Sequence, residues 1–153
     1  MSVRWTIVLA AAAALEMAAP GPVASQPKAK PTLDYDFYKA RVEPIFLKKK
    51  AGHTRCVVCH SEGNNAFRLE HLAPGAKGYT DEQSRKNFEM VSKLVNPGDP
   101  MVSRLLMHPL APEGGGDVFH SGGRQFMSVK DADWKAMAAF VNGATLGGRS
   151  KKH

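Results

Sequence analysis

The residues with the clearest chemical signature are Cys56 and Cys59, which are separated by Val57 and Val58 and followed directly by His60. Cys-x-x-Cys-His is the attachment signature of c-type haem, in which the two thiols add to the porphyrin vinyl groups as thioethers. One turn of chain places both sulfurs along one edge of the ring, and the histidine beneath it reaches the iron. The same residue types also occur in zinc sites and redox-active disulfides, so the rest of the sequence must decide.

Zinc and disulfide chemistry both lack support elsewhere in the chain. A structural zinc site needs four ligands, but there is no third cysteine, and the histidines do not show the short paired spacing of a zinc finger. A thioredoxin-like motif needs a strand-helix frame, for which the sequence has no pattern. We therefore expect Cys56 and Cys59 to bind one haem covalently, with His60 as its proximal ligand to iron.

Helices on either side must position this motif. Residues 34–48 are expected to be helical, with Asp34 as the N-cap, because their apolar residues fall on one helical face. That face comprises Tyr38, Val42, Ile45 and Phe46. Pro44 removes a hydrogen bond to the carbonyl four residues back, so we expect the helix to kink or restart there.

Two helices are predicted after the motif. Thr80 to Gln83 form a capping box, and the helix that follows carries an apolar stripe and stops at Asn96-Pro97-Gly98. The stripe comprises Ser84, Phe88, Val91 and Val95. A shorter helix is expected from Asp99-Pro100 through Met107, with proline in the first turn, where its missing N–H costs nothing.

Residues 109–127 are expected to form an extended loop, because their glycines and two prolines are too many for a regular element. Residues 128–131 can then cap a final helix that Gly143 ends. Its apolar face comprises Trp134, Met137, Ala138 and Val141. Without a convincing strand pattern, the sequence predicts an all-α fold with few helices, long loops and a small core that a bound haem would complete.

The chain resembles small single-haem cytochromes c, and most of all the planctomycete-type cytochrome c domains of exported proteins. The resemblance runs from Phe37 to Gly143, and its motifs besides the haem motif are residues 41–46, residues 97–100 with 103–106, and the helix from Asp133 to Val141. It implies a cytochrome c-like fold, in which the first and last helices cross beside the haem. The Val42 and Phe46 face would then pack against Trp134 and Val141.

The resemblance also bears on the second axial ligand. Many family members supply a methionine from a Met-Pro-Pro segment before the last helix, but this sequence has none. Family variants with a His-x-Gly-Gly segment at this place resemble bis-histidine haems, and here His120 is followed by Ser121, Gly122 and Gly123. His120 is therefore expected to be the second ligand to iron.

The residues themselves agree with His120 but leave alternatives open. Its neighbouring glycines let the backbone lie close to a haem face, and Phe119 and Phe126 could seal the site. His108, Met107 and Met127 are the other candidates for the sixth position. Arg55 and Arg124 flank the cofactor segments and could pair with haem propionates.

The first residues have the pattern of an export signal, with Arg4 before an apolar run and small residues at Val23 and Ser25. We expect a signal peptide over 1–25, a linker over 26–32, a cytochrome c domain over 33–146 and a basic tail over 147–153. The location would be periplasmic, with no membrane span after cleavage. An uncleaved membrane anchor is the alternative, although the apolar run is shorter than the about 20 residues a spanning helix needs.

The chain of 153 residues carries a formal charge of +7, which favours acidic protein partners. Nucleic acid is not expected as a partner, because no aromatic residues interleave with the bases. Signatures of Ser-His-Asp and phosphate-loop enzymes are absent from the sequence. The expected function is therefore single-electron transfer between a periplasmic donor and acceptor. A haem enzyme or gas sensor with a labile sixth ligand, or a haem subunit of a larger respiratory complex, is the alternative.

Overall fold

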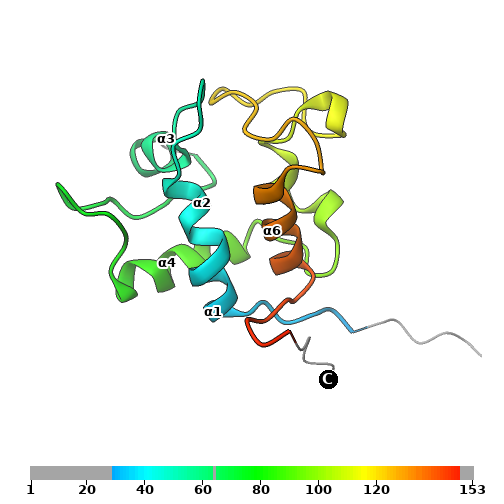
Figure 1. Cartoon of the computed structure of the whole chain (residues 1–153), viewed down its shortest axis with the longest axis horizontal. Coiled ribbons are helices and arrows are strands. Elements are labelled where there is room, and N and C mark those ends of the chain that lie inside the picture. Colours follow the sequence, from blue (N-terminus) through cyan, green and yellow to red (C-terminus); the bar gives the residue numbers. More distant parts are fainter. Residues whose placement is uncertain (1–28, 64, 149–153) are drawn as a thin grey trace, which may run out of the picture.

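The computed structural model describes residues 29–63 and 65–148 (Figure 1). The predicted signal peptide over 1–25 lies outside these residues, as do residues 26–28 of the linker and 149–153 of the tail. The described elements are α1 (Tyr35–Phe37), η1 (Tyr38–Val42), α2 (Glu43–Leu47), α3 (Cys56–Glu62), α4 (Asp81–Ser92), η2 (Pro100–Val102), α5 (Arg104–Met107), η3 (Pro112–Gly114) and α6 (Ala132–Val141).

Within these ranges the chain is mainly helical, which confirms the all-α class. No strand forms there, and the single β-bridge joins Leu110 to Phe126. None of the described helices has the length and apolar character needed to cross a bilayer.

The first helical segment begins at the predicted cap and changes its winding before Pro44. The Asp34 carboxylate accepts a hydrogen bond of 2.7 Å from Phe37 N. The next turn is a π-helix, in which Glu43 N donates to the carbonyl of Tyr38, and α2 begins at Glu43 with Pro44 in its first turn. Because proline has no N–H to donate, the regular pattern cannot continue through it. The predicted restart is therefore confirmed.

The helix after the motif begins as predicted and ends earlier. Thr80 and Gln83 form both hydrogen bonds of the capping box. The helix ends at Ser92, whose hydroxyl donates to the carbonyl of Phe88 at 2.7 Å, and the carbonyl of Leu94 accepts from Leu105 N in α5. The predicted helix over 99–107 is split into η2 and α5, because the Ser103 hydroxyl bonds the carbonyl of Asp99 at 2.7 Å.

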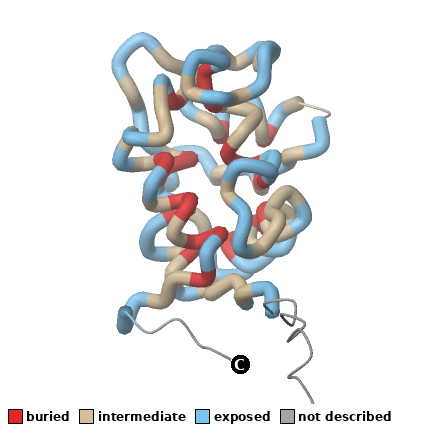
Figure 2. Tube along the Cα trace, turned by 90° about the vertical axis from the view of Figure 1, so that its right-hand side faces the viewer, coloured by how far each residue is buried: buried red, intermediate tan, exposed pale blue. Residues whose placement is uncertain are grey.

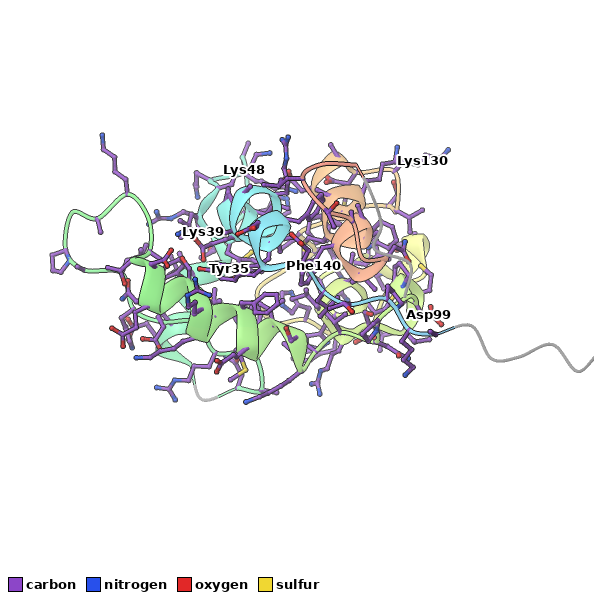
Figure 3. The ribbon with its side chains drawn as sticks, turned by 90° about the horizontal axis from the view of Figure 1, so that it is seen from below. Tyr35, Lys39, Lys48, Asp99, Lys130 and Phe140 are labelled. Carbon is purple, nitrogen blue, oxygen red and sulfur yellow. The ribbon has the colours of Figure 1, made fainter. Side chains whose placement is uncertain are left out.

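The last helix packs against the first. Asp131 caps α6 through the backbone nitrogens of Asp133 and Trp134, and the buried side of α6 faces η1. The rings of Tyr38 and Phe140 pack with centroids 5.9 Å apart and planes tilted by 51°, and the ring centroid of Phe88 in α4 lies 6.1 Å from that of Phe140. Figure 3 shows Tyr35 and Phe140 where these three helical segments meet. The Val42, Phe46, Trp134 and Val141 side chains all belong to this core.

The core occupies the centre of the trace, with exposed loops around it (Figure 2). The predicted loop over 109–127 is confirmed and contains only the short η3. Its two ends are held together, because Ala111 N donates to the carbonyl of Phe126 at 2.8 Å and Gln125 N donates to that of Pro109 at 3.0 Å. In Figure 1, α3 and this loop lie at the same end of the molecule, above α2 and α6.

Candidate functional site

The Cys-x-x-Cys-His residues lie on α3, whose first turn begins at Cys56. Val57 and Ser61 are buried on its inner side, while Cys56 is half-buried and Cys59 is exposed. Positions three and four apart share a helix face, so Cys56, Cys59 and His60 point the same way. All three line one cavity.

This cavity holds about 810 Å³ of empty space, part of it open to solvent. Its walls come from α2, α3, α5, α6 and the loop over 109–127, and they include the apolar Ile45, Phe46, Leu105, Phe126 and Met137. The apolar walls therefore fit a hydrophobic group beside the two cysteines.

Two histidines from segments that are far apart in the sequence both line this cavity. His60 comes from α3 and His120 from the long loop, and their ring centroids lie 6.2 Å apart with the ring planes 18° from parallel. Imidazoles bound through nitrogen to opposite sides of one metal ion, at about 2.0–2.1 Å each, would have centroids about 6 Å apart. The separation of the His60 and His120 ring centroids is close to this value.

Hydrogen bonds define which ring nitrogen of each histidine is free. The Nδ1 of His60 lies 2.8 Å from the carbonyl oxygen of Phe67 and 3.1 Å from Oδ1 of Asn65, and that of His120 lies 2.6 Å from the carbonyl oxygen of Gly123. Carbonyl oxygens only accept, so Nδ1 carries the proton and donates in both rings. In the neutral form of either ring the lone pair is then on Nε2, the arrangement typical of metal-binding histidines.

Burial lowers the pKa of His120, and the hydrogen bond to the carbonyl of Gly123 partly opposes this shift. The lowered pKa favours the neutral imidazole. A neutral ring is the form that binds a metal.

The other candidates for the sixth position divide into two groups. His108 lines the same cavity, with its ring 5.0 Å from that of His120 and its Nδ1 2.8 Å from Oδ2 of Asp117. Met107 and Met127 are not among the described residues that line it; Met127 is 66% exposed and Met107 packs against the core. Of the candidates for the sixth position, the structure thus brings His108 and His120, but neither Met107 nor Met127, to the cavity that His60 lines.

The two predicted sealing residues behave differently. Phe126 is buried and forms part of the cavity wall, as expected. Phe119 is 71% exposed and is not among the described residues that line the cavity, so its sealing role stays a prediction. Its neighbour Val118 is also exposed, because this part of the loop is held by hydrogen bonds and not by packing.

Three arginines lie near the cavity. Arg55 and Arg104 line it, and Arg104 is one that the sequence did not single out. The guanidinium of Arg124 donates to the carbonyl of Val118, while its Nη1 is buried and has no hydrogen-bond partner among the described residues. A buried donor without a partner fits an anionic group, such as a carboxylate of the cofactor.

The described residues do not form a metal site from protein side chains alone. The described residues contain no cluster of three or more His, Cys, Asp or Glu side chains that could hold a metal ion. Burial raises the pKa of the Cys56 thiol to about 11, which the nearby Lys50 charge only partly opposes. Reactive Cys-x-x-Cys thiols instead have pKa values of about 3.5–7.5.

His53 and His71 are not among the described residues that line the cavity. His71 pairs through Nδ1 with Glu62 at 3.2 Å and is 60% exposed.

No protein-family model matches the chain, and the searches of curated proteins and solved structures also give no match.

Proposed function

We propose that this chain is an exported, periplasmic c-type cytochrome of cytochrome c-like fold that carries single electrons between redox partners. The observation that carries the proposal is the His60–His120 pair, with ring centroids 6.2 Å apart and both Nδ1 atoms bonded to backbone carbonyls. Cys56 and Cys59 lie on the wall of the same cavity, where their sulfurs would form thioethers with one haem.

Bound haem would supply a one-electron couple between ferric and ferrous iron. The chain would hold it by three kinds of contact. His60 and His120 would bind the iron, the apolar wall would exclude water, and Arg55, Arg104 and Arg124 would pair with the haem carboxylates. A second imidazole in place of a thioether favours ferric iron, so we expect a low-potential carrier.

The partners we propose are acidic proteins that dock at the cavity mouth beside Cys59. Cys59 is exposed and Val58 is 45% exposed, so this edge is accessible. The described residues that line the cavity include Arg55 and Arg104 but no Asp or Glu. Opposite charge would therefore guide an acidic donor or acceptor to this edge.

Expression with a haem-maturation system tests the covalent attachment. We expect the mass of the denatured wild-type protein to increase by one haem, and the combined Cys56→Ala and Cys59→Ala variant to lose it. The His71→Ala variant is the control, because His71 lies on the surface beside Glu62. A wild-type protein that carries zinc and no haem would overturn the proposal.

A haem enzyme or gas sensor is the second candidate function, and His108 is the observation in its favour. Its ring lies beside that of His120 and its Nδ1 is bonded to the Asp117 carboxylate. If His120 left the iron, His108 would be placed to exchange protons with a small bound molecule. An iron that binds carbon monoxide at once in the wild-type protein would favour this function.

A further inference from the structure

A set of contacts beside the cavity joins the segment before α3 to the base of the loop that bears His120. The Lys50 ammonium lies 3.2 Å from the carbonyl oxygen of Gln125, 3.1 Å from Oδ2 of Asp133 and 4.6 Å above the ring of Phe126. The Gln125 side-chain amide donates to the carbonyl of Thr54 at 3.2 Å. These contacts join residues more than seventy positions apart.

The same contacts connect both ligand-bearing segments. Thr54 lies two residues before Cys56, and the Gln125 amide also lies 3.4 Å from the carbonyl oxygen of Gly122, two residues after His120. In Figure 1 the tip of the segment before α3 and the His120 loop lie next to each other at one end of the molecule. One side chain therefore joins the entry to the haem motif with the turn that carries His120.

Before Val118 the loop is anchored through Asp117, whose backbone N donates to the carbonyl of Met107 at 3.0 Å and whose carboxylate lies 2.8 Å from Nδ1 of His108. From Val118 to Arg124 the other anchors are few among the described residues. Val118 and Phe119 are exposed, and the bonds within the turn are local, from Gly123 N to the carbonyl of His120 and from Arg124 to that of Val118. Local bonds shape a turn but do not hold it against the opposite wall. Segments with few buried contacts open more readily than the core.

We propose that Lys50 and Gln125 are positioning residues that hold the His120 loop against the haem-motif segment and so keep His120 in place opposite His60. The expected effect at the iron rests on the proposed function. The contact between these two residues and the loop does not depend on it. Lys50 is well suited to the role because its side chain is only 19% exposed and is paired with Asp131 and Asp133 at the start of α6. Its ammonium is thereby fixed next to Gln125.

Lys48 provides a matched control. Its ammonium pairs with the same Asp133, at 3.0 Å, but it makes no contact with the loop among the interactions of the described residues. Lys48→Met and Lys50→Met therefore remove the same charge and one ion pair to the same carboxylate, while Lys50→Met also removes the pair with Asp131 and the contact over the Phe126 ring. Only Lys50→Met removes the hydrogen bond to Gln125.

The deciding experiment compares Lys50→Met, Gln125→Leu and Lys48→Met in the full chain matured with haem, after a thermal melt has shown that each variant is folded. Amide hydrogen exchange is measured over residues 117–126, and carbon monoxide binding to the ferrous protein is timed. We expect Lys50→Met and Gln125→Leu to exchange and to bind carbon monoxide about tenfold faster than Lys48→Met. Lys50→Arg, which keeps the charge, should restore slow exchange if Lys50→Met fails to fold.

The two readouts separate this proposal from the proposed function. Equal exchange in Lys50→Met, Gln125→Leu and Lys48→Met would overturn the positioning role, whatever the iron does. Faster exchange without covalently bound haem would support the loop contact and overturn the proposed function. Faster exchange with unchanged carbon monoxide binding would overturn the claim that the loop contact holds His120 on the iron.

Discussion

Gly122 lies against the ring of His120, and a Cβ atom at Gly122 would come 3.2 Å from Cε1 of that ring. This contact is tighter than ordinary van der Waals separation. The absence of a side chain at Gly122 therefore gives the imidazole the space to lie over its own turn, with Nδ1 on the carbonyl of Gly123.

Gly122→Ala should move the His120 ring. We expect the haem-loaded variant to show a measurable high-spin fraction in the ferric optical spectrum, because the displaced imidazole binds iron less well. Gly78→Ala is the control, since a Cβ there would meet nothing within 4 Å. Identical spectra for the two variants would contradict the account of Gly122.

Asn65→Ala should raise the reduction potential. Its Oδ1 lies 3.1 Å from Nδ1 of His60, and a hydrogen bond at this nitrogen makes the imidazole a stronger donor that favours ferric iron. Losing one hydrogen bond changes the free energy by about 0.5–1.5 kcal/mol. For a one-electron couple, in which 59 mV corresponds to a tenfold change in the equilibrium constant, this is a shift of about 20–60 mV in the reduction potential. A potentiometric titration measures the shift, with the exposed Asn142→Ala as control. A lower reduction potential in Asn65→Ala than in the wild type would contradict this prediction.

Thr80→Ala should reduce stability without changing the haem spectrum. The Thr80 hydroxyl accepts from Gln83 N, and losing such a cap costs about 0.5–2 kcal/mol. Urea unfolding followed by circular dichroism measures the loss. An altered axial-ligand spectrum would show that α4 is coupled to the site more closely than these contacts indicate.

Glu43→Gln should stabilise the protein at neutral pH. Glu43 is 6% exposed, and burial raises its pKa, which the hydrogen bond from Ser84 and the charge of Lys39 only partly oppose. A folded pKa above the unfolded value of about 4.3 means that the unfolded state ionises first, so the wild type loses stability as pH rises through this range. Glutamine has no such titration.

Unfolding free energies at pH 4 and pH 7 check this prediction, with the exposed Glu89→Gln as control. The advantage of Glu43→Gln over the wild type should be present at pH 7 and should shrink toward pH 4. If Glu43→Gln is the less stable protein at pH 7, the Glu43 carboxylate stabilises the fold and the prediction is wrong.

The helices that hold the site could largely be predicted from sequence, because their start signals are local. Asp34, the Thr80–Gln83 box and Asp131 each bond to backbone nitrogens two or three residues away. The ends were less well predicted. The helix starting at Asp81 stops at Ser92 because side-chain and tertiary bonds compete there, and no local pattern reports them.

The residues of the site divide in the same way. The spacing of Cys56, Cys59 and His60 carries their chemistry, and the glycines after His120 indicate a close backbone approach. Arg104, Gln125 and Asn65 had no signal, because each reaches the site only through contacts that folding creates. Their residue types are common on surfaces, so sequence alone cannot select them.

The most direct test of the central claim, that His60 and His120 both bind the haem iron, is the optical spectrum of the ferric and carbon monoxide-treated ferrous protein in the wild type, His120→Ala and His108→Ala. We predict a low-spin wild type without a sulfur-to-iron band, a His120→Ala variant that binds carbon monoxide readily, and a His108→Ala variant like the wild type. A sulfur-to-iron band in the wild type would instead assign the position to Met107 or Met127, and a high-spin wild type would leave it open; either result contradicts the claim.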